Sequence, residues 1–214
     1  MHYKNLVNRL QGLACILGPL LGLLAALAFL AGQQALEGVI GYYGMILFIP
    51  LYLALAGIIG QQMPIYGLLC IILGLFAGAF GPFGLAMRVV YVALVRAEVP
   101  SAVSAGNFDA AMATLFYAHP EFVLMGILGL LWPLTHVING IGLLRLGRSS
   151  IGSGLFLIAG GVCFFIAQAL AIELPVLYPL AMALLLAGSA PIGWQLLKSG
   201  PSDFAHSNSL SVRG

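Results

Sequence analysis

The residues of this sequence with chemical potential are few, and most of them lie in one stretch. Trp132, Thr135, His136 and Asn139 fall within eight residues of an otherwise apolar segment. In a helix, side chains four residues apart share a face, so Trp132 would meet His136 and Thr135 would meet Asn139. Gln168 adds an amide from the next apolar segment. A histidine in such surroundings could bind a haem iron, carry a proton or contact a substrate.

The competing interpretation of His136 is structural. A bis-histidine haem needs a second histidine at the same depth, and His119 would lie about 25 Å away along one helix. His2 and His206 lie near the chain ends. Ligation by one histidine and one methionine stays open, but we favour a structural histidine that is hydrogen-bonded to a neighbouring helix. The sequence indicates no metal site, and it leaves the cofactor unknown.

The other candidate site is a charged one. Arg88 is the one charged residue that falls clearly inside an apolar segment. It would lie about 34 Å along a helix that starts at residue 65, near one membrane interface. Glu121 and Glu173, at the ends of neighbouring segments, could face it. We favour snorkelling or an ion pair for Arg88, and the alternative is contact with an anionic ligand.

Signatures of enzymes are missing from the sequence. It contains no HExxH, no GxSxG and no P-loop motif, and no paired carboxylates lie in mid-segment. Cys15, Cys70 and Cys163 lie far apart in apolar segments and resemble small buried apolar residues more than a metal site. We therefore expect a protein that is not an enzyme.

The elements that must position these residues are membrane spans. The chain is 62% hydrophobic and 7% charged, with a mean hydropathy of +1.09, which a soluble domain cannot accommodate. The sequence predicts an all-α fold, a polytopic bundle of transmembrane helices in one domain over 1–198, with a polar cytoplasmic tail over 199–214. Each span needs about 20 apolar residues. The six predicted spans are 11–32, 38–60, 65–95, 121–143, 151–172 and 175–197.

The third span is unusually long. Residues 65–95 would run for about 46 Å as a helix, whereas the hydrocarbon core is about 30 Å thick. Proline removes a backbone donor, so Gly81, Pro82 and, in the last span, Pro191 are predicted helix breaks. The third span would then be one kinked helix or two half-helices. In the loop over 96–120 we predict a short interfacial helix.

The two halves of the chain show weak self-similarity. At offsets of 110 or 111 residues, 16–18 match 127–129, 40–41 match 151–152 and 77–78 match 187–188. With three spans in each half, such a relation would make a 3+3 inverted repeat, an arrangement found in transporters. The alternative is chance, because chains of Leu, Ile, Gly and Ala match themselves readily.

The charges also predict an orientation. Lysine and arginine accumulate in cytoplasmic loops. With an even number of spans, one side of the membrane would carry most of the cations, namely Lys4, Arg9, Arg145, Arg148, Lys198 and Arg213. Five of the six acidic residues would lie on the other side, namely Glu37, Glu98, Asp109, Glu121 and Glu173. We therefore predict a bacterial-type inner (plasma) membrane protein with both termini in the cytoplasm.

These observations favour one class of function over another. The near absence of charge inside the spans favours a structural or accessory subunit of a larger membrane assembly, with the bilayer and other membrane subunits or a second copy as partners. The alternative is a small transporter, channel or lipid-handling protein, with its site near the predicted breaks and the His136 cluster. Nothing in the net charge of +2 indicates binding to nucleic acid.

Overall fold

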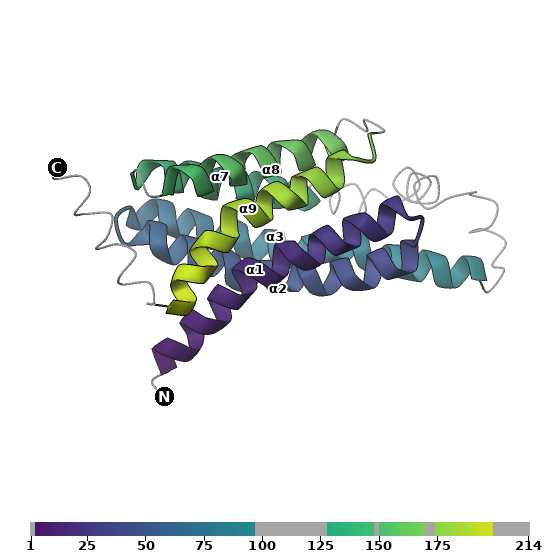
Figure 1. Ribbon diagram of the computed structural model, residues 1–214, viewed down its shortest axis with the longest axis horizontal. Helices are drawn as coiled ribbons and strands as arrows, with labels where there is room; N and C mark the ends of the chain where they lie inside the picture. The colour runs from purple at the N-terminus through teal and green to yellow at the C-terminus, as the bar shows by residue number, and fades with distance from the viewer. Residues whose placement is uncertain (1–2, 97–127, 148–149, 170–173, 199–214) are drawn as a thin grey trace.

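The computed structural model describes residues 3–96, 128–147, 150–169 and 174–198. These residues are helical and contain no strand, which confirms the all-α prediction. The described ranges contain six helices of 15 residues or more: α1 Tyr3–Leu30, α2 Gln34–Gly60, α3 Pro64–Arg96, α7 Leu131–Arg145, α8 Ile151–Ala169 and α9 Leu177–Lys198 (Figure 1).

Four of these helices, α1, α2, α3 and α9, are long and apolar enough to cross a membrane. The described part of α8 adds a shorter apolar segment, Ile151–Ala167. The predicted fourth span, 121–143, begins outside the described residues, and α7 forms its second half. The predicted interfacial helix in 96–120 and the tail over 199–214 also lie outside the described residues.

The first two helices begin several residues earlier than the apolar pattern predicts. α1 starts at Tyr3 rather than at residue 11, and α2 starts at Gln34 rather than at residue 38. Hydropathy marks the part of a helix that suits lipid, but backbone hydrogen bonding continues through polar residues such as Asn8 and Arg9. The apolar pattern therefore identifies these helices and underestimates their length.

The turn between α1 and α2 is a Schellman motif. The N–H of Gln33 donates to the carbonyl of Ala28 at 2.9 Å, and that of Gly32 donates to Phe29 at 2.9 Å. Gly32 has a φ of 71°, the left-handed conformation that this motif needs and that glycine adopts at little cost. The motif ends α1 and reverses the chain into α2.

The helices close into a ring. Each one packs against the next along the chain, from α1 to α2 and α3, then to α7, α8 and α9, and α9 packs against α1. α2 also touches α7 across the ring. The N-terminal end of α1 and the C-terminal end of α9 lie at the same end of the bundle (Figure 1). The first and last helices are thus direct neighbours.

Glycines allow close approach at several seams of the ring, which are the lines along which two helices contact each other. A methyl group placed on Gly67 would lie 2.5 Å from Cα of Gly60, at the seam of α2 and α3. One on Gly154 would lie 2.8 Å from the carbonyl oxygen of Gly140, between α7 and α8. Small residues let backbones approach in this way, which strengthens packing between helices in membranes.

The predicted helix breaks lie inside continuous helices, at Gly81 and Pro82 in α3 and at Pro191 in α9. α3 continues through Pro82, and α9 continues through Pro191. Each proline removes one backbone donor, but the other hydrogen bonds of the helix remain, and contacts with neighbouring helices stabilise it. The third span is therefore a single helix and not two half-helices.

Candidate functional site

The polar residues of α7 lie on the face of the helix that points into the ring. Thr135, His136 and Asn139 have no exposed surface, and Trp132 is 2% exposed. On the opposite face, Leu134 is exposed. Their spacing of three and four residues puts all four on one stripe, as the sequence predicted. The stripe faces α2, α3 and α8.

His136 joins α7 to α2. Its Nδ1 lies 2.9 Å from the carbonyl oxygen of Trp132. The hydroxyl of Tyr52 lies 3.3 Å from Nε2 and 3.4 Å from Nδ1. A carbonyl only accepts, so Nδ1 carries the proton and donates to Trp132, and Nε2 accepts from the hydroxyl of Tyr52. With both nitrogens engaged, neither presents a free lone pair to a haem iron in this arrangement.

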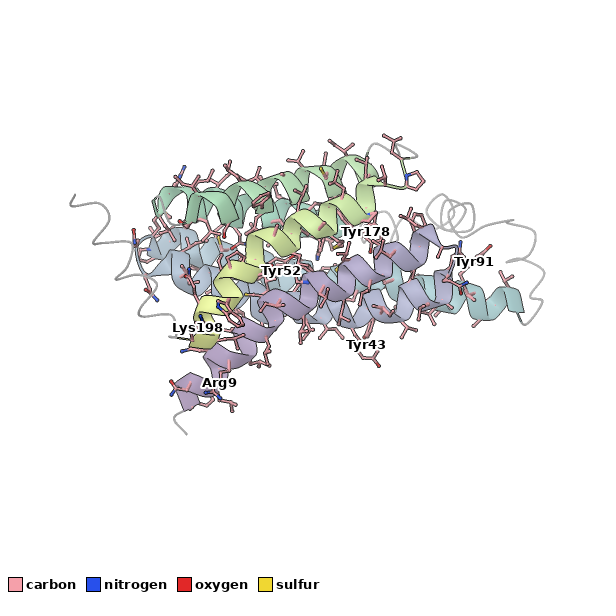
Figure 2. The ribbon with its side chains drawn as sticks, in the orientation of Figure 1. Arg9, Tyr43, Tyr52, Tyr91, Tyr178 and Lys198 are labelled. Atoms are coloured by element: carbon pink, nitrogen blue, oxygen red, sulfur yellow. The ribbon has the colours of Figure 1, made fainter. Side chains whose placement is uncertain are left out.

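Aromatic rings surround the histidine. The centroid of Trp132 lies 4.4 Å from that of His136, Tyr52 lies at 5.2 Å and Phe48 at 5.3 Å. Phe164 of α8 packs on the other side of Trp132 at 4.3 Å. Tyr52 lies in the interior of the bundle in Figure 2. The site is therefore an aromatic core with one imidazole in it.

The sequence did not predict the residues of other helices that surround Trp132 and His136. Phe48 and Phe164 are ordinary apolar residues in apolar segments, and no local pattern singles them out. Tyr52 carried a signal, because it lies in mid-segment, far from the interfaces where tyrosines of membrane proteins gather. Within the described residues, no three His, Cys, Asp or Glu side chains are placed to hold a metal ion together.

The remaining polar groups of the stripe bond mainly to backbone. The hydroxyl of Thr135 donates to the carbonyl of Leu131 at 2.7 Å, with Leu73 of α3 at 3.3 Å. The amide nitrogen of Asn139 donates to the carbonyl of Thr135 at 2.8 Å. Two buried atoms have no hydrogen-bond partner among the described residues: Nε1 of Trp132 and Oδ1 of Asn139.

The candidate charge site lies outside what the structure describes. Glu121 and Glu173 are not among the described residues, and neither the side chain of Arg88 nor that of Gln168 is described. The predictions made for these four residues therefore stay predictions.

One acidic residue has an unexpected place. Glu37, in the first turn of α2, is 1% exposed. The partial positive charge of a helix N-terminus favours a carboxylate there. No local pattern of the sequence indicates this burial, because it depends on the neighbouring helices.

Ser189 makes a second polar contact between distant parts of the chain. Its hydroxyl lies 2.6 Å from the carbonyl oxygen of Cys15 on α1 and 2.8 Å from that of Leu185 in its own helix. Tyr66 of α3 likewise donates to the carbonyl of Ile138 on α7 at 2.7 Å. Polar side chains therefore connect the first three described helices to the last three at several seams.

A hollow of about 280 Å³ lies away from the polar stripe. It lies where the turn between α1 and α2 meets the C-terminal part of α3. Its lining residues are Gly32, Gln33, Gln34, Ala35, Tyr91, Val92 and Val95. None of the polar residues of α7 lines it, so the two features are separate.

Comparison of the chain with protein-family models, with curated proteins and with solved structures gives no match. The class of the protein therefore follows from its own fold and site. It is an all-α protein with four helices long and apolar enough to cross a membrane. Its polar cluster is buried in the ring of helices.

Proposed function

We propose that the chain is a non-enzymatic, multi-pass membrane protein that acts as a structural or accessory subunit of a larger membrane assembly. The observation that carries this proposal is the state of the polar stripe. Thr135, His136 and Asn139 are fully buried, and their hydrogen bonds go to backbone carbonyls and to Tyr52. Such residues stabilise contacts between helices, whereas a substrate site needs groups that a ligand can reach.

The outer faces of the helices support the same proposal. Large apolar side chains are exposed along α3 and α8, among them Leu68, Ile72, Phe76, Leu155 and Phe165. Apolar faces of this kind suit lipid tails or the helices of other membrane proteins. In this proposal the chain acts through contacts made by these faces.

The charges at the bundle ends support the proposed topology. Arg9 and Lys198 lie at one end of the bundle, and Tyr91 and Tyr178 lie toward the other (Figure 2). Arg145, at the end of α7, lies over the ring of Tyr66, which is in the first turn of α3. Clustered cations favour the cytoplasmic side. We therefore propose cytoplasmic termini in a bacterial-type inner membrane.

The test is purification from native membranes in a mild detergent or in nanodiscs. The native mass, the absorbance spectrum and the identity of co-purifying proteins would be recorded. A stable assembly larger than the 22.4 kDa chain, containing other membrane proteins, is the expected result. A lone protomer, or a homo-oligomer without partners, would overturn the subunit proposal.

A second candidate is a small transporter or channel. It is favoured by two buried atoms that have no hydrogen-bond partner in the described part of the chain, Nε1 of Trp132 and Oδ1 of Asn139. A methyl group on Gly81 would lie 2.8 Å from Cδ1 of Trp132, so the indole lies directly against the Gly81-Pro82 step of α3. Unpaired buried polar groups mark sites where water or a ligand completes the bonding. Transport assays with His136→Ala would follow if the subunit proposal fails.

A further inference from the structure

The first and last helices cross at a point of very close contact. A methyl group on Gly12 would lie 2.8 Å from the carbonyl oxygen of Gly193 and 3.2 Å from the backbone nitrogen of Leu197. The crossing of α1 and α9 is visible toward the N-terminal end of the bundle in Figure 1. Residues that flank these glycines are therefore brought together from opposite ends of the sequence.

Two cations flank the crossing. Arg9 precedes Gly12 by about one turn of α1, and Lys198 directly follows Leu197 in α9. Both side chains are exposed, and both lie at the same end of the bundle (Figure 2). Neither α1 nor α9 contains an acidic residue, so neither helix supplies a partner for these charges.

An exposed tryptophan completes the arrangement. Trp194 is 57% exposed, and Nζ of Lys198 lies 4.9 Å from the centre of its ring. The amphipathic indole prefers the level of the lipid headgroups. Leu10 and Leu13, on either side of Gly12 in α1, expose apolar surface that would suit acyl chains. Cationic, aromatic and apolar groups thus gather at this crossing, and these are the groups that would contact the phosphate, the glycerol region and the tails of a phospholipid.

We propose that the crossing of α1 and α9 binds an anionic phospholipid, with Arg9 and Lys198 contacting its phosphate and Trp194 lying against its glycerol region. The inference depends on the membrane location in the proposed function, and not on the subunit role. Basic sites between helices on the cytoplasmic side of a membrane bind anionic headgroups. Free phosphate would use the two charges alone, whereas a lipid would also use the indole and the leucines.

Trp194 itself supplies the probe. The chain has two tryptophans, and Trp132 is buried, so Trp132→Phe leaves Trp194 as the reporter. The variant would be reconstituted into phosphatidylcholine vesicles that contain dibrominated phosphatidylglycerol or, at equal mole fraction, dibrominated phosphatidylcholine. Bromine quenches a nearby indole. We expect the anionic lipid to quench more strongly, and its relative affinity to fall roughly fivefold for each of Arg9→Gln and Lys198→Gln.

The matched control is Arg145→Gln, which removes a cation that also lies over an aromatic ring, 5.5 Å from the centre of Tyr66. Arg145→Gln should leave the quenching by the anionic lipid unchanged. If Trp132→Phe does not fold, the difference in quenching between the full chain and Trp194→Phe isolates the same indole. The conservative double change Arg9→Lys with Lys198→Arg should retain the preference.

Three results of the quenching experiment would overturn the inference. They are equal quenching by the two brominated lipids, an equal loss in Arg145→Gln, and complete displacement of the anionic lipid by millimolar inorganic phosphate. The last would assign the charges to free phosphate. A lone protomer in the native-membrane purification would overturn the subunit proposal, but it would not affect the inference about lipid binding. Failure of the protein to float with vesicles would remove the membrane location, and with it this inference.

Discussion

Tyr52 and His136 are 84 residues apart in the sequence, and the hydroxyl of one lies 3.3 Å from Nε2 of the other in the buried centre of the ring. Because the other imidazole nitrogen donates to Trp132, this contact gives the lone pair of Nε2 its partner. It is a side-chain bond between α2 and α7, which come from the two halves of the chain.

Tyr52→Phe removes that hydroxyl and leaves Nε2 of His136 buried without a donor. An unpaired buried acceptor costs about 1–3 kcal/mol, so the free energy of unfolding should fall by about that amount. Thermal or denaturant unfolding in detergent measures it. The control is Tyr43→Phe. Because Tyr43 is exposed on the outer face of α2, this change should lower the free energy of unfolding only slightly. Equal losses in the two variants would contradict the importance of the buried bond.

Gly12→Ala and Gly57→Ala should have opposite effects. The new methyl at position 12 would meet the backbone of α9, which cannot yield without moving the helix, whereas that at position 57 meets nothing within 4 Å. Overpacking costs about 1–3 kcal/mol. Alanine in an open helical position stabilises by about 0.5–1 kcal/mol relative to glycine. Melting temperatures in detergent show whether each change stabilises or destabilises the protein. Stabilisation by Gly12→Ala would contradict the close crossing of α1 and α9.

Asn139→Cys should resist charged thiol reagents, because position 139 is fully buried. The experiment starts from a chain in which Cys15, Cys70 and Cys163 are replaced by alanine. Gln62→Cys, at the exposed turn between α2 and α3, serves as the accessible control and should react rapidly. Reaction of Asn139→Cys at a comparable rate would mean that water reaches the stripe, and would favour the transporter over the subunit.

Ser189→Ala should weaken the seam between α1 and α9 modestly. The hydroxyl has one proton, and two carbonyl oxygens lie within its reach. The carbonyl of Leu185 belongs to the same helix as Ser189, whereas that of Cys15 belongs to α1. The change therefore removes one contact between helices, the one with Cys15. Interhelical hydrogen bonds in membranes contribute about 0.6 kcal/mol on average. A double-mutant cycle with Gly12→Ala should show coupling, and strict additivity would place the two effects at separate seams.

The sequence predicted some features of this molecule because they depend on neighbours along the chain. Trp132 and His136, four residues apart, do contact each other, and helical periodicity alone requires this. The helices themselves were equally clear from hydropathy, although α1 extends to Tyr3 because backbone hydrogen bonding does not stop where polar residues begin.

Other features depend on contacts that no local pattern contains. Phe48 and Tyr52 reach His136 from α2 because α2 crosses the ring to touch α7. α3 continues through Pro82 and α9 continues through Pro191 for the same reason, since packing against neighbouring helices maintains a helix that a proline would weaken in isolation. Burial of Glu37 likewise depends on elements distant in sequence.

The packing of α9 against α1 has a consequence for biogenesis. During synthesis the N-terminal helices emerge first, and the surface of α1 around Gly12 has no partner until residues near Gly193 have been made. The ring therefore cannot close before α9 has been translated. Until then the face of α1 around Gly12 has no helix against it, and the arrival of α9 closes the ring.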